Sequence, residues 1–270
     1  VVSQSKSSVA AENVLLRKFP NQPMGPAVER AEGAYLVLED GTQLLDANAG
    51  GSSFAVLGFS HPDVLEAMRA QMTRYCHVDF NSWTNPLTEE LAALILSRAP
   101  EGLSRVYFAG GSGSEAVEAA MKLSYQVHHD NGRPERTWTI SRNQSYHGAT
   151  LGSLMASELN NLGFYEPLLP VNHARIEQHH PLYYRRDDES LDDYARRSAQ
   201  ELEDKILEIG ADKVSAFIGE TMLSAMVGDV PPAPGYWKYV REVCDRHGIH
   251  LILDEVYCGL GRSGRSFCCE

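Results

Sequence analysis

The sequence is short of basic residues, long apolar runs and paired cysteines, and each shortage excludes a class of protein. It has 24 basic and 36 acidic residues, which gives a net charge of −12. A nucleic acid partner is therefore not expected, because a phosphate backbone demands clustered Lys and Arg. No apolar run approaches the roughly 18 residues that cross a bilayer, so no membrane partner is expected either. The opening stretch VVSQSKSSVAAEN lacks the apolar core of a secretory signal.

The cysteines and histidines suggest neither a disulfide framework nor a metal site. The cysteines form no CxxC pair and are odd in number, which favours reduced thiols in a cytoplasmic protein. They stand at positions 76, 244, 258, 268 and 269. Adjacent histidines at 128–129 and 179–180 lack the spacing of a helix-borne metal site. We predict that both pairs lie on the solvated surface and that the protein binds no metal.

Apolar runs alternate with helical patterns through most of the chain, which indicates an α/β fold. Strands are predicted at 105–108, 136–142, 214–220 and 249–256, and helices after residue 112, within 145–157, and over 190–209 and 234–247. The last two strands are almost wholly apolar, as strands buried on both faces should be. The alternation predicts a mainly parallel central sheet flanked by helices. The segment 158–189 is expected to be a long loop.

The first part of the chain has a different pattern. The stretch YLVLEDGTQLLD at 35–46 predicts a hairpin that turns at Asp40–Gly41, and helices are predicted to begin near Pro62 and Pro86. We expect residues 1–50 to form an N-terminal arm and hairpin, part of a small domain, and residues 51–270 to form a large domain. The chain stops in a glycine-rich loop just after a central strand, so this large domain is expected to be incomplete at its C-terminus.

The stretch AGGSGSEAVEAAMKL at 109–123 places a Gly/Ser turn between an apolar run and a helix, which is a ready-made anion site. It is not a P-loop, because no GxxxxGK[ST] is present. It matches the dinucleotide pattern GxGxxA through Gly111, Gly113 and Ala116. The next strand ends at Arg142 rather than at an acidic residue, which disfavours NAD and leaves NADP open, with Arg142 on its 2′-phosphate. A capped helix that binds no ligand is a further alternative.

Two further stretches favour a different cofactor. SYHGATLGS at 145–153 places Tyr146 in a loop just after a predicted parallel strand, where α/β sheets bind ligands. LILDEVYCGLGRSG at 251–264 ends a buried strand with Asp254 and Glu255. Burial strongly penalises an unpaired carboxylate. A protonated pyridine nitrogen would pair with Asp254, and the ring would then act as an electron sink.

Together, SGSEAVEAAMKL, SYHGATLGS and LILDEVYCGLGRSG resemble the class III (omega-type) aminotransferases, pyridoxal phosphate enzymes of fold type I. The stretch LEDGTQLLDANAGGSSFAVLGFSHPDVLEAM resembles the N-terminal part of the same family, and the similarity runs from about residue 30 to the last residue. The resemblance implies the large domain of fold type I with a small N-terminal lobe, and a homodimer. It also implies transfer of an amino group from an amine or amino acid to a keto acid.

The resemblance assigns roles around the cofactor. Gly113 and Ser114 would bind its phosphate through backbone N–H groups and a hydroxyl, aided by the helix dipole. Tyr146 would stack on one face of the pyridine ring, and Val256 would pack against the other face.

Further roles follow from the same resemblance. Asp254 would pair with the ring nitrogen and keep it protonated, and Glu220 matches the family's glutamate near the cofactor. Ser53 and Trp83 lie where family members line the substrate pocket. His147 is expected to be loop structure rather than an acid–base group.

The lysine that forms a Schiff base with the cofactor in this family has no counterpart in the chain. In the family it lies downstream of the strand that Asp254 ends. The lysines present are predicted in helices, flanking turns or the N-terminal tail, and they are Lys6, Lys18, Lys122, Lys205, Lys213 and Lys238. The sequence also departs from the family at Thr221–Met222, where Pro and Val are common. We therefore predict a truncated class III aminotransferase, and we expect these 270 residues alone to be inactive.

Three alternatives stay open from the sequence. Relatives with the same cofactor cradle racemise or decarboxylate amino acids. A non-catalytic fragment or pseudoenzyme would act only by binding a partner subunit. An NADP oxidoreductase is the third alternative, and it gives Asp254 and Tyr146 no role.

Overall fold

The computed structural model describes residues 25–49, 55–79, 82–158, 163–223 and 226–270, which fall into two compact units. The first unit ends at Trp83 and the second begins at Thr84. The predicted boundary after residue 50 falls inside the first unit. The division into an N-terminal arm and a large domain stays a prediction.

The described part of the first unit contains a three-stranded antiparallel sheet and the helix α1. Its strands are β1 (Val28–Glu32), β2 (Tyr35–Leu38) and β3 (Gln43–Leu45), and its helix is α1 (Pro62–Met72). The hairpin between β2 and β3 confirms the predicted turn at Asp40–Gly41. The Asp40 carboxylate accepts a hydrogen bond from the Thr42 N–H at 2.9 Å, and Gly41 has a φ of 85°, which glycine adopts without steric cost.

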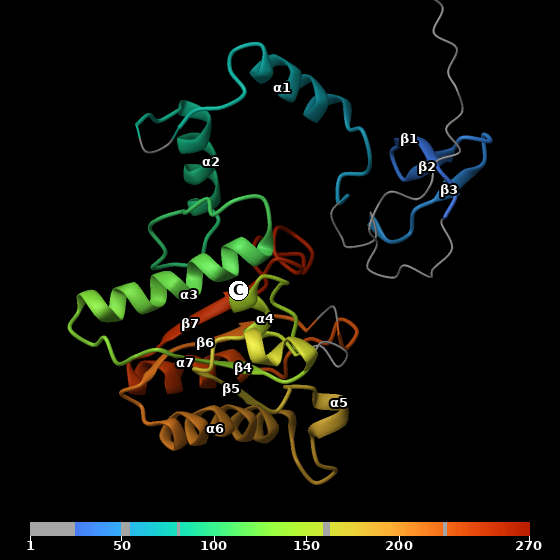
Figure 1. The fold of residues 1–270 in the computed structure, drawn as a ribbon. Coiled ribbons are helices and arrows are strands. Elements are labelled where there is room, and N and C mark those ends of the chain that lie inside the picture. Colours follow the sequence, from blue (N-terminus) through green and yellow to red (C-terminus); the bar gives the residue numbers. More distant parts are fainter. Residues whose placement is uncertain (1–24, 50–54, 80–81, 159–162, 224–225) are drawn as a thin grey trace, which may run out of the picture. The chain divides into compact units, whose positions relative to one another are not determined.

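The second unit is built on a four-stranded parallel sheet in the order β5-β4-β6-β7 (Figure 1). The strands are β4 (Trp138–Arg142), β5 (His173–Ile176), β6 (Val214–Glu220) and β7 (His250–Asp254). Every neighbouring pair is parallel, so the four carboxyl ends meet at one edge of the sheet. All seven residues of β6 are buried. This arrangement confirms the predicted α/β fold with a parallel sheet.

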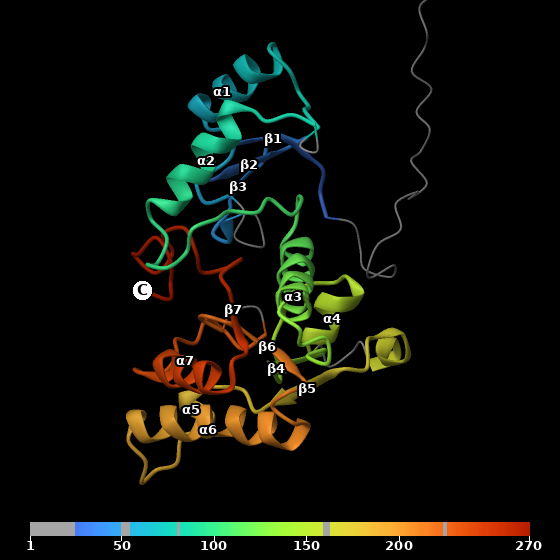
Figure 2. The same ribbon diagram turned by 90° about the vertical axis from the view of Figure 1, so that its left-hand side faces the viewer.

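Helices cover both faces of this sheet. Figure 2 shows α3 (Gly113–Asp130) and α4 (Leu151–Ala156) on one side and α6 (Leu191–Ile209) and α7 (Tyr236–His247) on the other. The second unit also contains α2 (Pro86–Leu96), α5 (Pro181–Tyr184) and a 3₁₀ helix (Gly163–Leu168). Among the helices of the described residues, none is both long enough and apolar enough to cross a membrane.

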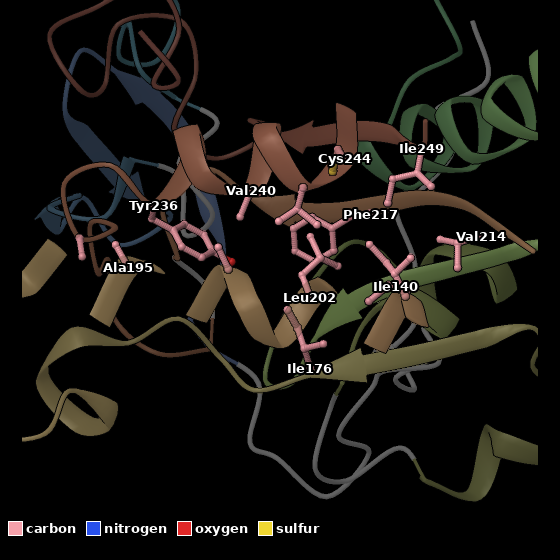
Figure 3. Close-up of a cluster of buried hydrophobic side chains, with 14 of the residues drawn as sticks. Ile140, Ile176, Ala195, Leu202, Val214, Phe217, Tyr236, Val240, Cys244 and Ile249 are labelled. Carbon is pink, nitrogen blue, oxygen red and sulfur yellow. The ribbon is translucent and has the colours of Figure 1, made fainter. Parts of the chain in front are cut away.

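Successive side chains of β6 point to opposite faces of the sheet, and each packs into the hydrophobic cluster on its own face. Phe217 packs with Leu202 of α6 and Val240 of α7, in the cluster that Figure 3 shows between the sheet and these helices. Ile218, the next residue, packs with Val117 of α3 on the opposite face. Fully burying a side chain of this size stabilises the fold by about 1.5–3 kcal/mol. The sheet is therefore held from both sides.

The structure differs from the prediction in the connecting segments. The segment 158–189, predicted to be a loop, contains β5, α5 and the 3₁₀ helix. Residues 105–108 are not a strand and have no sheet partner among the described residues. The surface assignment of the histidine pairs was wrong for His128, His179 and His180, which are at most 3% exposed, whereas His129 is exposed.

His179 is enclosed because it stacks between two tyrosines. Its ring centroid lies 4.8 Å from that of Tyr194 and 3.7 Å from that of Tyr236. The Ala233 N–H donates to His179 Nε2 at 3.0 Å, so the ring proton must sit on Nδ1, which donates to Ser198 Oγ at 3.0 Å. The ring is therefore neutral, and a second proton on Nε2 would break the bond to Ala233.

Burial, together with the positive charge of the nearby Arg142, lowers the pKa of His179 to about 3. The ordinary pKa of a histidine is about 6.5. Between these two values the unfolded chain binds a proton at this position that the folded chain does not. Stability therefore rises with pH across this window, by up to about 1.4 kcal/mol per pH unit.

We expect this histidine to make the protein less stable in acid. The free energy of unfolding, measured by urea denaturation, should fall between about pH 7 and pH 5, and His179→Gln should make that fall shallower because its side chain does not titrate. The control is His129→Gln, which removes an exposed histidine and should keep the wild-type slope. Equal slopes in both variants would contradict this role of His179.

Candidate active site

Two buried carboxylates end neighbouring strands at the carboxyl edge of the sheet. Glu220 is the last residue of β6 and Asp254 the last residue of β7, and the two are register partners. The Glu220 residue is 4% exposed and the Asp254 side chain 6%. The Thr221 N–H donates to the Asp254 carbonyl at 3.2 Å, which continues the pairing beyond the strands. The pairing of β6 with β7 therefore holds Glu220 and Asp254 side by side at the carboxyl edge of the sheet.

The Asp254 carboxylate is held from two sides. One oxygen accepts from His147 Nδ1 at 2.7 Å, and the other accepts from the Val256 N–H at 3.0 Å. The His147 side chain is fully buried, and its own backbone N–H donates to Ser157 Oγ at 2.7 Å. The sequence prediction treated His147 as loop structure and missed this contact. His147 orients the carboxylate, so its role reaches beyond the loop.

The N-terminus of α3 leaves backbone donors open. Ser112 caps the helix by accepting from the Glu115 N–H at 3.3 Å, and the Glu115 carboxylate accepts from the Gly111 N–H at 2.9 Å. The N–H groups of Gly113 and Ser114 have no hydrogen-bond partner within the described part of the chain. Free N–H groups in the first turn of a helix attract an anion, and the helix dipole adds to the attraction.

Two contacts join this helix end to the other parts of the site. A Cβ on Gly113 would lie 2.9 Å from both methyl groups of Val256, so only glycine lets the helix approach the end of β7 this closely. The Ala149 N–H donates to Ser114 Oγ at 3.0 Å, which ties the loop after β4 to α3. The structure therefore brings Gly113, Ser114 and Val256 together, as the sequence prediction requires.

Tyr146 and Val256 follow the carboxyl ends of β4 and β7. Tyr146 is 40% exposed and Val256 62% exposed, so both keep surface that a ligand can cover. Their packing on a cofactor ring stays a prediction. Trp83 lies in the first unit and is exposed, and Ser53 falls outside the described residues. The substrate-pocket roles of these two residues also stay predictions.

Arg142 does not fit the alternative role on an NADP phosphate. It is 1% exposed, and its guanidinium donates to the Glu220 carbonyl. The same group lies over the ring of Trp237, 5.3 Å from its centroid. Arg142 is thus built into the interior behind the strand ends, and it cannot present its charge to a ligand.

No described lysine is a hydrogen-bond or ion-pair partner of Asp254. Lys122 is exposed on α3, and Lys213 precedes β6, at the amino edge of the sheet. Lys205 pairs with Glu208 of its own helix at 2.6 Å. Lys238 lies on α7, where Glu242 is its ion-pair partner. Lys6 and Lys18 fall outside the described residues.

The buried carboxylate and the open helix end are the two features that the predicted cofactor requires, and their roles on that cofactor stay predictions. Asp254 suits the nitrogen, and the open N–H groups of α3 suit the phosphate. The parallel sheet with helices on both faces is the α/β architecture that the sequence predicts for the large domain of fold type I.

Comparisons with known proteins identify the family. The family model described as Aminotransferase class-III matches residues 19–270. An uncharacterized aminotransferase of Schizosaccharomyces pombe is 38% identical over 265 residues, which are 98% of this chain and 57% of that protein. The chain belongs to the class III aminotransferase family.

Solved structures show the same fold. An omega-aminotransferase from Paracoccus denitrificans superposes with a TM-score of 0.88 at 30% identity, over 98% of this chain and 60% of that one. A PLP-bound aminotransferase mutant from Vibrio fluvialis superposes with a TM-score of 0.82 at 30% identity, over 91% of this chain and 54% of that one. The chain spans about half the length of the curated relatives it matches.

The contact between Gly113 and Val256 gives a test of the site's geometry. Gly113→Ala should lower the free energy of unfolding by about 1–3 kcal/mol, because the added methyl group overpacks the interface. The matched control is Gly111→Ala, where a Cβ meets nothing within 4 Å and the change should stay within about 0.5 kcal/mol. Urea denaturation measures both.

A double variant shows whether the two side chains act on each other. Val256→Ala removes the methyl groups that the new Cβ would meet, so Gly113→Ala should cost less in the Val256→Ala background than in the wild type. The same cost in both backgrounds would show that the close approach does not limit residue 113.

Proposed function

We propose that the whole protein is a pyridoxal phosphate-dependent aminotransferase, which moves an amino group from an amine or amino acid to a keto acid. The observation that carries the proposal is the buried Asp254 carboxylate. His147 and the Val256 N–H hold it beside the open N-terminus of α3. Membership of the class III aminotransferase family supports the same reaction.

Each residue of the site has a defined task in this proposal. The N–H groups of Gly113 and Ser114 hold the phosphate, and the Ser114 hydroxyl, which accepts from Ala149, keeps its own proton free to donate. Tyr146 and Val256 confine the ring. Bound pyridoxal phosphate supplies an electron sink for negative charge that develops on the substrate α-carbon.

Asp254 keeps a proton on the ring nitrogen, and the protonated ring accepts negative charge more readily. An ionised carboxylate close to the nitrogen favours its protonated form. His147 Nδ1 donates to the same carboxylate, so the oxygens stay in place when the ring binds. Glu220, next to Asp254 in the sheet, adds a second carboxylate near the cofactor.

The proposal requires a lysine that the described residues do not bring to Asp254. In the whole protein, we propose, such a lysine would hold the cofactor and would move a proton at the substrate α-carbon. The 270 residues alone are then expected to show no amino transfer. A purified polypeptide of this sequence, incubated with pyridoxal phosphate, an amine and a keto acid, tests this point.

We also propose a cytoplasmic homodimer. All five cysteines are unpaired, which fits a reducing compartment. Leu87, Leu91 and Leu94 of α2 are 45–51% exposed and offer apolar surface that a second copy can cover. Sedimentation of the whole protein would show a mass of two chains.

Asp254→Asn in the whole protein tests the proposed function. The amide has nearly the shape of the carboxylate but no charge, so the ring nitrogen loses its proton. Amino transfer should fall on the order of a hundredfold, as when one preorganised charged group is lost from a site. Cofactor should still bind through the phosphate. Product analysis with an amine and a keto acid measures the transfer, and cofactor absorbance measures binding.

The matched control is Asp245→Asn on α7. Asp245 pairs with Arg241 on the surface at 2.6 Å, so its loss should leave the rate unchanged. A wild-type protein that binds the cofactor but inverts or decarboxylates an amino acid, without consuming the keto acid, would show a different reaction on the same site. Full amino transfer by Asp254→Asn would refute the role of the carboxylate.

A further inference from the structure

The backbone pairing between β4 and β6 stops before the carboxyl edge of the sheet. Within these two described strands the last register pair is Ile140 with Phe217, whereas β6 and β7 stay paired as far as Glu220 and Asp254. The contact of His147 with Asp254 joins the loop after β4 to the end of β7, with β6 between them. A contact outside the backbone ladder must therefore hold β4 beside β6 at this edge.

The side chain of Arg142, the last residue of β4, makes such a contact. Its guanidinium donates to the Glu220 carbonyl. The N–H of the same peptide group belongs to Thr221, and it donates to the Asp254 carbonyl at 3.2 Å. The peptide group between Glu220 and Thr221 is therefore held at both ends, and it links Arg142 of β4 to the end of β7.

Arg142 approaches β6 from the face away from the two carboxylates. Side chains of a strand alternate between faces, and Gly219 belongs to the face that α6 and α7 cover, as Phe217 does. A Cβ on Gly219 would lie 2.9 Å from the Trp237 ring and 3.2 Å from Arg142 Nη2. Arg142 and Trp237 therefore pack on the backbone of β6 from this face, and the next residue, Glu220, belongs to the opposite face.

Trp237 of α7 holds the guanidinium in place. The guanidinium carbon of Arg142 lies 5.3 Å from the centroid of a Trp237 ring, and Trp237 Nε1 donates to the Thr221 carbonyl at 2.9 Å. Arg142 is 1% exposed, and burying a guanidinium is costly unless its surroundings compensate the charge. An apolar side chain would fill the same space without that cost. Packing alone therefore does not account for an arginine at this position.

We propose that Arg142 is a positioning residue of the candidate active site. It sets the spacing of β4 and β6 at the carboxyl edge, and through that spacing it sets the contact of His147 Nδ1 with the Asp254 carboxylate. Arg142 acts through the backbone of β6 rather than on substrate or cofactor. Its effect on amino transfer rests on the proposed function, whereas its effect on the contact of His147 with Asp254 can be measured without any reaction.

Arg136 provides a matched control at the other end of β6. It is also buried, and its guanidinium donates to the carbonyls of Val214 at 2.8 Å, Gly248 at 3.1 Å and His247 at 3.0 Å. Val214 is the first residue of β6, so Arg136 lies at the amino edge of the sheet. Arg136→Met should lower the melting temperature, as Arg142→Met should, but only the change at Arg142 should disturb the carboxyl edge.

Proton NMR of the whole protein without cofactor tests the inference. The Nδ1 proton of His147, which is buried and bonded to a carboxylate, should give a low-field resonance that His147→Gln identifies by its loss. Arg142→Met should shift or abolish this resonance, and Arg136→Met should leave it in place. An unchanged resonance in folded Arg142→Met would overturn the inference. A wild-type protein without the resonance would contradict the contact on which the inference rests.

Amino transfer provides a second, independent readout. A displacement of about 1 Å at a site can cost up to a hundredfold in rate, so Arg142→Met should lower kcat on the order of tenfold to a hundredfold and change KM for the amine by less than about twofold. Arg136→Met should keep the wild-type kcat. Wild-type kcat in Arg142→Met would overturn the inference. A wild type that transfers no amino group, but whose His147 resonance responds to Arg142→Met, would refute the proposed function and leave the positioning role standing.

If Arg142→Met does not fold, Arg142→Lys decides the question. The ammonium group keeps a positive charge and a donor for the Glu220 carbonyl, but it does not lie flat on Trp237 as a guanidinium does. The His147 resonance should therefore shift, and kcat should fall by less than in a variant without any donor. An unchanged resonance together with wild-type kcat would then overturn the inference.

Discussion

The structure of the second unit depends on the parallel pairing of β6 with a strand on each side. All seven residues of β6 are buried, so its backbone groups must find partners inside the protein. The pairs with β4 and β7 supply them. Because parallel strands need long crossovers, the chain returns through helices that cover both faces. The two core clusters and the common carboxyl edge both follow from this one strand.

The carboxyl edge of the sheet contains the least favourable burial described for this fold. Burying two adjacent carboxylates is unfavourable unless each is compensated. Asp254 is compensated by His147 and by the Val256 N–H, and its site adjoins the open helix end at Gly113. A sheet that needed stability alone would place apolar side chains there. The arrangement is intelligible when a cationic ring nitrogen completes it.

Sequence patterns predicted the elements whose signals are local. Strand β6 is a continuous apolar run, and α6 and α7 have capping residues and helical periodicity. Strand β5 was missed because only one of its four residues is fully buried, so no alternation is visible. The candidate residues Gly113 and Asp254 come from sequence motifs, and their roles on a cofactor stay predictions. The partnership of His147 with Asp254 was missed, because it joins residues 107 positions apart.

That separation has a consequence for synthesis of the chain. The turn and the first residues of α3 are close together in the chain, so the donors at this helix end are all made early in synthesis. The contact between His147 and Asp254 cannot form early, since Asp254 lies 107 residues beyond His147 in the chain. Under the proposed function, a nascent chain that stops short of β7 has the helix end for the phosphate but not the carboxylate, so both halves of the cofactor site exist only after Asp254 and Val256 have been made.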